Sequence, residues 1–131
     1  MTAFRKVTND FAVSPQISPA DIATAAAGGV TLVINNRPDG EAPDQPAGAV
    51  IEAAARQAGL DYIHIPIAGR PSAAQVEAMR TAVSQTSGNV LAYCRSGTRS
   101  ITVWAMGLDE PRETLLALSL AAGYDLSGML S

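Results

Sequence analysis

The chain has 131 residues, of which 47% are hydrophobic and 16% charged, and its formal net charge is −3. This length and composition predict a single domain over residues 1–131, and the chain is too apolar to be disordered by composition. The negative net charge gives no electrostatic basis for binding nucleic acid or an acidic membrane surface. We expect no membrane contact, since no apolar run approaches the length of a membrane span.

The chain contains one cysteine and one histidine. A single cysteine excludes an intramolecular disulfide, and this pair of residues is too few for a zinc site of Cys and His ligands. We therefore expect no metal and no cofactor. The first residues lack the apolar segment of a secretion signal. A reducing, cytoplasmic setting is the expectation, and it would keep Cys94 as a free thiol.

The predicted strands and helices alternate along the chain. Apolar runs bounded by turn residues predict strands at 4–7, 11–13, 30–34, 62–67 and 89–93. Capping residues and apolar stripes predict helices at 19–27, 47–58, 72–85, 100–108 and 111–122. This alternation predicts an α/β domain with a central, largely parallel sheet of four or five strands flanked by helices.

Three loops are predicted to leave the carboxyl ends of the parallel strands, at residues 35–46, 68–71 and 94–99. Ligands bind at these ends in sheets of this kind. The first loop is polar and unusually long for a compact domain, which favours a functional role, although a plain surface loop has the same composition. Beside the cysteine loop, the candidates to line the pocket are Arg37, Asp39 and Arg70.

The last of these loops has the residue types of an anion-binding loop built around a nucleophile. Thiolate is the reactive form of cysteine, and a helix N-terminus and a nearby arginine both favour it. Backbone N–H groups of a glycine-containing loop form a nest for an anion, and a guanidinium holds two of its oxygens. We therefore predict Cys94 as the nucleophile and Arg99 as its partner. The residues expected to bind substrate with them are Arg95, Ser96, Gly97, Thr98 and Ser100.

An inert core cysteine is the alternative interpretation, because free cysteines are usually buried and unreactive. Two arginines within five residues of a buried, inert thiol would be costly to accommodate, however. This cost favours the functional interpretation of the loop.

The cysteine loop and its neighbours, Tyr-Cys-Arg-Ser-Gly-Thr-Arg-Ser, resemble the active-site loops of two families. The cysteine, glycine and arginine of the rhodanese loop are matched by Cys94, Gly97 and Arg99. In protein tyrosine and dual-specificity phosphatases, histidine usually precedes the cysteine and the arginine lies one residue further on. Here Tyr93 replaces that histidine, and Ser100 stands where that arginine would be.

Together with the segments 11–14, 34–41 and 64–66, the loop resembles a small bacterial family, the phosphatase-like domain of the beta-lactamase-hydrolase-like proteins. The resemblance covers roughly residues 4–110. It implies a fold like that of the protein tyrosine and dual-specificity phosphatases, with a cysteine loop of rhodanese length. Members occur alone or fused to a metallo-hydrolase or persulfide dioxygenase domain, so the resemblance implies such an enzyme as a partner.

The first functional hypothesis is a rhodanese-like sulfurtransferase. The resemblance implies that a loop of this length accommodates a persulfide sulfur, and the loop 68–71 holds no carboxylate to act as a general acid. Cys94 would take sulfur from thiosulfate or a persulfide, form a persulfide itself, and pass the sulfur to an external thiol or cyanide. Arg70 suits an anionic donor, and Ser100 can hydrogen-bond the thiolate.

Two alternatives stay open at this point. The first is a cysteine-dependent phosphatase, which acts on a phosphate ester through a phosphocysteine at Cys94. It needs a proton donor for the leaving group, and Asp39 is the candidate. The second is a catalytically silent module that binds an anion or a partner protein.

Overall fold

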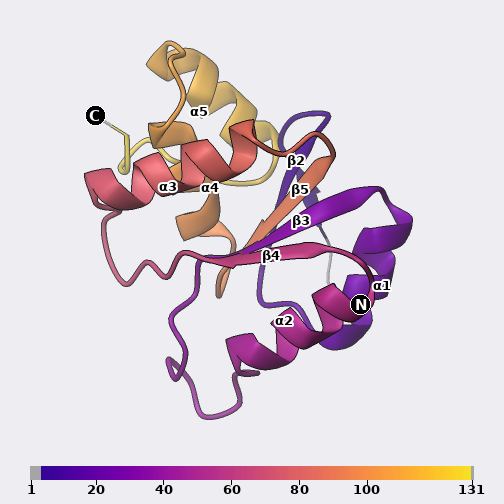
Figure 1. Cartoon of the computed structure of the whole chain (residues 1–131). Helices are drawn as coiled ribbons and strands as arrows, with labels where there is room; N and C mark the ends of the chain where they lie inside the picture. The colour runs from indigo at the N-terminus through magenta and orange to yellow at the C-terminus, as the bar shows by residue number, and fades with distance from the viewer. Residues whose placement is uncertain (1–3, 131) are drawn as a thin grey trace.

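The computed structural model describes residues 4–130 (Figure 1). Its strands, in chain order, are β1 (Arg5–Lys6), β2 (Phe11–Ser14), β3 (Val30–Asn35), β4 (Asp61–His64) and β5 (Asn89–Tyr93). Its helices are α1 (Pro19–Ala27), α2 (Gly48–Gln57), α3 (Ala73–Ser84), α4 (Thr98–Met106) and α5 (Arg112–Ala121). Within residues 4–130, no helix combines the length and the apolar character needed to cross a membrane.

The strands form one five-stranded sheet in the order β1-β2-β5-β3-β4. Every neighbouring pair is parallel except β1 and β2, which are antiparallel. The strand β5 lies at the centre, where Ala92 pairs with Val13 on one side and with Ile34 on the other. A central parallel strand is covered on both faces, which explains its continuous apolar sequence. The predicted α/β fold with a largely parallel sheet is confirmed.

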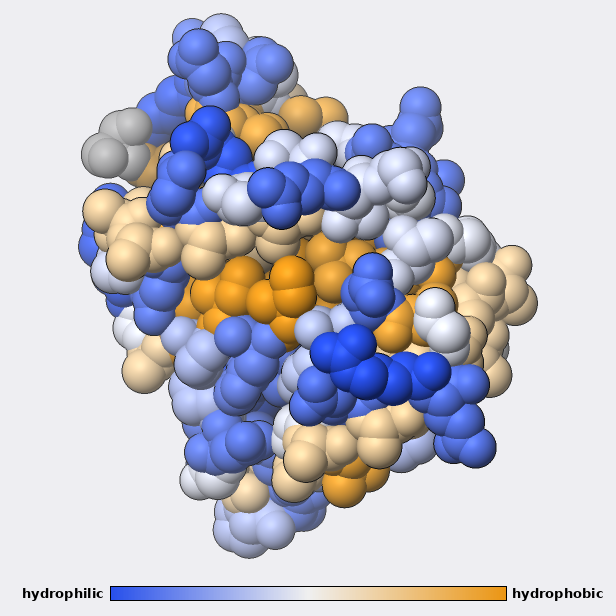
Figure 2. Space-filling model, in the orientation of Figure 1, coloured by the Kyte–Doolittle hydropathy of each residue, from blue (hydrophilic) through white to orange (hydrophobic). Residues whose placement is uncertain are grey.

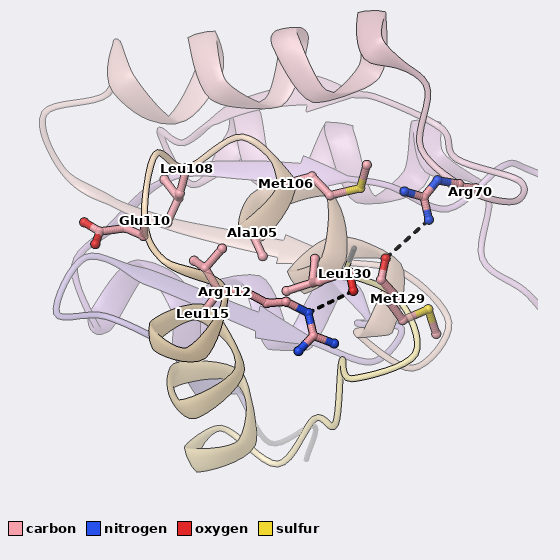
Figure 3. Close-up of a pocket in the computed structure, with 9 residues that line it drawn as sticks. All are labelled: Arg70, Ala105, Met106, Leu108, Glu110, Arg112, Leu115, Met129 and Leu130. Atoms are coloured by element: carbon pink, nitrogen blue, oxygen red, sulfur yellow. Dashed lines mark hydrogen bonds between the residues drawn. The ribbon is translucent and has the colours of Figure 1, made fainter.

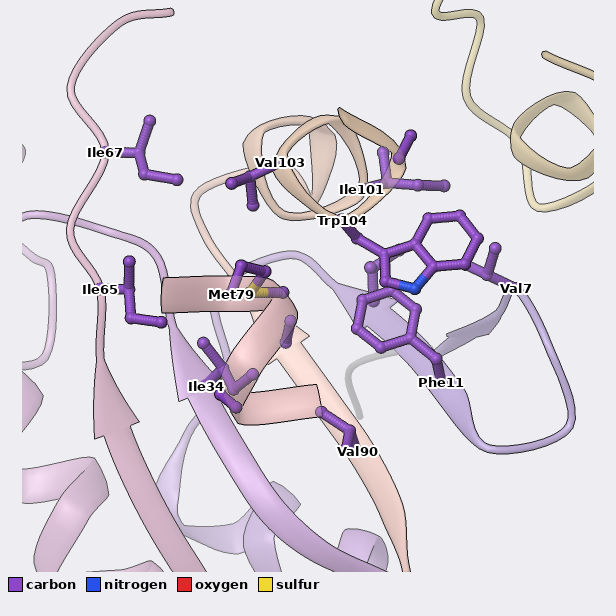
Figure 4. Packing of buried hydrophobic residues seen from close by; sticks show 14 of the residues in the cluster. Val7, Phe11, Ile34, Ile65, Ile67, Met79, Val90, Ile101, Val103 and Trp104 are labelled. Atoms are coloured by element: carbon purple, nitrogen blue, oxygen red, sulfur yellow. The ribbon is translucent and has the colours of Figure 1, made fainter. Parts of the chain in front are cut away.

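Helices cover both faces of the sheet, and alternate residues of each strand serve one face or the other (Figure 1). In β3, Leu32 and Ile34 pack toward α3 and α4, whereas Val33 packs toward α1 and α2. The rings of Phe11 and Trp104 stack with their centroids 5.0 Å apart and their planes at 8° (Figure 4). This contact fixes α4 against the sheet, and α4 directly follows the cysteine loop.

The structure differs from the sequence prediction in two elements. The helix α4 begins at Thr98, two residues before the predicted start, because the left-handed backbone of Gly97 turns the chain straight into the helix. The strand β4 ends at His64, earlier than predicted. It is an edge strand, and Ile63 is 37% exposed. Figure 2 shows hydrophobic residues gathered in a band on this face, between α3 and α2 at the level of β4.

Candidate active site

Cys94 directly follows the central strand β5 and is fully buried. Its Sγ accepts a hydrogen bond of 3.1 Å from the backbone N–H of Gly97. Gly97 has φ +97°, a conformation that glycine adopts without strain, and it is the N-cap residue of α4. The loop therefore folds back over the sulfur and brings the positive end of α4 to it, which favours a negative charge there.

Arg99 lies in the first turn of α4 and is held by three hydrogen bonds. Its Nη1 donates to Glu41 Oε2 at 2.7 Å and to the carbonyl oxygen of Ile67 at 2.7 Å, and its Nη2 donates to Glu41 Oε1 at 2.9 Å. The hydrogen bond with Arg99 is the main cause that lowers the pKa of Glu41 to about 2. The pKa of Arg99 is raised in turn, chiefly by Glu41 and further by the nearby Cys94. Both members of this pair are therefore ionised at neutral pH.

Two donors of the Arg99 guanidinium have no oxygen acceptor within residues 4–130. Of its five N–H groups, three are used by Glu41 and Ile67. The N–H of Nε and the second N–H of Nη2 lie on one edge of the planar group, and no oxygen of residues 4–130 accepts from them. Such an edge can hold two oxygens of a phosphoryl group at once. Cys94 also contributes to the raised pKa of Arg99, through its charge and through a side-chain hydrogen bond.

The long loop between β3 and α2 positions Glu41. Arg37 is buried, and its Nε donates to Glu41 Oε1 at 3.0 Å while its Nη1 donates to Gln16 Oε1 at 3.1 Å. Gln45 accepts from the backbone N–H of Glu41 at 2.9 Å, and His64 Nε2 lies 3.0 Å from the carbonyl oxygen of Arg37. The structure therefore brings Arg37 to the site, where its guanidinium holds Glu41.

Asp39 and Arg70 form hydrogen bonds with groups outside the cysteine loop. Asp39 Oδ1 accepts a hydrogen bond of 2.7 Å from the backbone N–H of Gly48, where α2 begins. Arg70 is exposed and donates to the carbonyl oxygen of Met129 at 3.3 Å. Arg70 also lines a cavity of about 330 Å³ together with Thr98 and Arg99. The structure thus puts Arg70 beside the cysteine loop and Asp39 at the start of a helix.

The other predicted loop residues fall into two groups. Arg95 and Ser96 are exposed, and Ser96 Oγ accepts from the backbone N–H of Thr98 at 3.4 Å. Ser100 is fully buried in the first turn of α4, and its Oγ has no hydrogen-bond partner within residues 4–130. A buried hydroxyl without a partner is costly, which sets Ser100 apart from the exposed residues of the loop.

The C-terminal segment up to Leu130 lies beside α4, a placement that the sequence did not predict. Arg112 donates to the carbonyl oxygen of Leu130 at 3.2 Å, and Arg70 donates to that of Met129 (Figure 3). Arg112 also donates to the carbonyl oxygen of Ser127 at 2.9 Å. These contacts hold the C-terminal segment against the domain beside α4, next to a second cavity of about 270 Å³. Backbone carbonyl acceptors have no signature in sequence, so this contact could not be foreseen.

The fold and the cysteine loop define a domain like the protein tyrosine and dual-specificity phosphatases. The structure matches the crystal structure of a candidate phosphatase from Neisseria meningitidis with a TM-score of 0.82 and 35% identity, covering 94% of this chain and 90% of that one. It also matches P. aeruginosa TpbA in complex with pTyr, with a TM-score of 0.67 and coverage of 96% and 77%. At 18% identity, the second match shows the fold alone.

The chain belongs to the family described as beta-lactamase hydrolase-like protein, phosphatase-like domain, whose model matches residues 3–110. This confirms the predicted family. The chain is 37% identical over 125 residues to a beta-lactamase hydrolase-like protein of Xylella fastidiosa. The match covers 92% of this chain, but the chain spans only 29% of that relative's length.

The prediction of a rhodanese-like sulfurtransferase is wrong. The family model describes a phosphatase-like domain, and the matching structure from Neisseria meningitidis is that of a candidate phosphatase. The prediction rested on loop length and on the missing carboxylate in residues 68–71. In the structure, the loop after β3 brings the carboxylate of Glu41 to Arg99, a contact between distant segments that the sequence did not predict. Thiosulfate, a thiol acceptor and a partner enzyme gain no support from these matches.

Proposed function

We propose that this domain is a cysteine-dependent phosphatase that hydrolyses phosphate monoesters. One observation carries the proposal. The guanidinium of Arg99 is fixed by Glu41 and Ile67 so that its two remaining N–H groups share one edge, which no oxygen of residues 4–130 occupies. A fixed edge of this kind binds two oxygens of a tetrahedral oxyanion without reorganising during the reaction.

The proposed reaction has two steps. In the first, the Cys94 thiolate attacks phosphorus, the P–S bond forms, the P–O bond to the leaving group breaks, and the leaving oxygen takes a proton. In the second, water attacks phosphorus, a new P–O bond forms and the P–S bond breaks, and inorganic phosphate leaves with return of the Cys94 thiolate. The proton of the water passes to the carboxylate that gave up its proton in the first step. Arg99 and the loop N–H groups stabilise the charge on the phosphoryl oxygens in both steps.

Asp39 is the proposed proton donor to the leaving group. Glu41 cannot fill this role, because a pKa of about 2 keeps it ionised at neutral pH. Asp39 uses one carboxylate oxygen to accept from Gly48, and its other oxygen has no partner within residues 4–130. Burial chiefly raises the pKa of Tyr93, and the charge of Asp39 contributes to the shift. The charge of Asp39 therefore acts on the residue that precedes Cys94.

We propose aryl phosphates, of which phosphotyrosine is one, as the substrate class. The related fold of P. aeruginosa TpbA was solved with pTyr bound. The cavity of about 330 Å³ beside Arg99 supports the same class, because Pro71 and Met129 form part of its wall. Apolar groups of this kind suit the ring of an aryl leaving group.

The direct test is hydrolysis of p-nitrophenyl phosphate by the purified chain and by Cys94→Ser, which changes one atom of the side chain. We expect turnover by the native chain, none by the variant, and a phosphoryl group on Cys94 in acid-quenched protein by mass spectrometry. No turnover of any aryl phosphate by the native chain, or equal turnover by Cys94→Ser, would reject the proposal.

A further inference from the structure

The peptide group between Ser96 and Gly97 is hydrogen-bonded at both of its ends. Its carbonyl oxygen, on Ser96, accepts from the hydroxyl of Tyr124 at 2.9 Å. Its N–H, on Gly97, donates to Cys94 Sγ at 3.1 Å. A trans peptide is planar, so its C=O and N–H point in opposite directions. Whatever fixes the carbonyl oxygen therefore fixes the direction of the N–H toward the sulfur.

Tyr124 also packs directly against the backbone of the cysteine loop. A Cβ atom built on Gly97 would clash with the hydroxyl oxygen of Tyr124. Burial raises the pKa of Tyr124, and the negative charge of Cys94 raises it further, which places the phenol close to the sulfur. Glycine is therefore favoured at position 97 for two reasons. It adopts a φ of +97° without strain, and its lack of a side chain leaves room for the phenol of Tyr124.

The segment that carries Tyr124 is separate from the sheet that carries the cysteine. Tyr124 follows α5, and its backbone N–H donates to the carbonyl oxygen of Ser119 at 2.9 Å. The residue lies beyond 3–110, the part of the chain that the family model matches. The nucleophile loop of this chain is therefore supported by a segment outside the region that defines the family.

We infer that Tyr124 is a positioning residue, which holds the Ser96–Gly97 peptide so that its N–H points at the sulfur of Cys94. Without the phenol, that peptide is free to rotate, and the sulfur loses a donor that stabilises its anionic form. The effect on the sulfur follows from the geometry alone, whereas the effect on turnover rests on the proposed phosphatase function.

Tyr124→Phe tests this inference, because it removes the hydroxyl and keeps the ring that packs on Gly97. The chain has one cysteine, so alkylation by iodoacetamide reports on Cys94 alone. We expect alkylation at neutral pH to slow by about threefold, since the lost donor lowers the thiolate fraction while a less stabilised thiolate reacts faster. We also expect kcat for p-nitrophenyl phosphate to fall by about tenfold, with KM changed less than about twofold.

Arg112→Gln is the matched control, because it removes contacts to the C-terminal segment without touching Tyr124. It should alkylate at the native rate. The inference is overturned if Tyr124→Phe alkylates at the native rate, or if Arg112→Gln slows alkylation equally, since general loosening of the segment would then explain the effect. Slower alkylation of Tyr124→Phe alone supports the inference even if the native chain hydrolyses no phosphate ester, a result that rejects only the phosphatase.

Discussion

Glu41 and Arg99 lie 58 positions apart in the chain and form a bidentate ion pair, with oxygen–nitrogen distances of 2.7 and 2.9 Å. The pair joins the loop after β3 to the first turn of α4. It uses the end of the guanidinium and leaves the Nε edge without an oxygen partner in the described residues 4–130. We therefore interpret Glu41 as the residue that holds the guanidinium of Arg99 in position, and substitution of Glu41 tests this role.

Glu41→Gln should weaken substrate binding. The amide keeps the size of the side chain but loses its charge, so Arg99 is held less firmly and its free edge is less well aimed. We expect KM for p-nitrophenyl phosphate to rise about tenfold, with a smaller change in kcat. Glu77→Gln, which removes an exposed pair with Arg80, should leave KM unchanged. A lower KM in Glu41→Gln would instead mean that Glu41 competes with substrate for Arg99.

Stability should depend on the ionisation of Glu41. Its pKa is lowered from 4.5 to about 2, chiefly by the hydrogen bond with Arg99. A lowered pKa in the folded state means that the pair stabilises the fold above about pH 4.5 and loses this contribution as the pH falls toward 2. In urea unfolding, the free-energy difference between the native chain and Glu41→Gln should shrink over that range. A difference independent of pH would contradict the assignment.

Asp39→Asn should reduce turnover in a way that depends on the leaving group. Asparagine keeps an oxygen to accept from the N–H of Gly48, so the start of α2 is preserved. A poor leaving group needs the proton donor, and we expect a loss of about 100-fold with phenyl phosphate but a smaller loss with p-nitrophenyl phosphate. Equal losses with both substrates would show that Asp39 does not protonate the leaving oxygen.

Arg99→Lys should abolish most activity while keeping the positive charge. Lysine cannot present two parallel N–H groups on one edge, so the phosphoryl oxygens lose a bidentate partner. We expect kcat/KM to fall by at least about 100-fold. Arg80→Lys, an arginine on the exposed face of α3, is the control and should behave like the native chain. Near-native activity in Arg99→Lys would remove the observation on which the proposed function rests.

Gly97→Ala should destabilise the domain more than Gly40→Ala. Both glycines have positive φ, +97° and +77°, so both substitutions add backbone strain of about 1 kcal/mol or more. Only Gly97 faces an obstacle, because its new Cβ would clash with Tyr124, whereas Gly40 has nothing within 4 Å. Urea unfolding of the two variants separates the clash from the strain. Equal losses would show that Tyr124 yields freely to a side chain at position 97.

Local features of the chain could be predicted from sequence. The strand β5 has the predicted bounds, 89–93, because its apolar run is bounded by turn residues and ends at the cysteine loop. The capping box of Ser72 and Gln75 correctly marked the start of α3. The order of alternating elements gave the α/β class, and the residues of the cysteine loop gave the family. Each of these signals is carried by residues within a few positions of one another.

The contacts that complete the site were decided by the tertiary structure. Glu41, the carbonyl oxygen of Ile67 and the phenol of Tyr124 reach the cysteine loop from three distant segments. Sequence placed the loops at one edge of the sheet but could not show which carboxylate would meet Arg99. The physical reason is that each contact depends on how separate elements pack together. Every residue has a backbone carbonyl, so the sequence does not show which carbonyl a given arginine or tyrosine will contact in the fold.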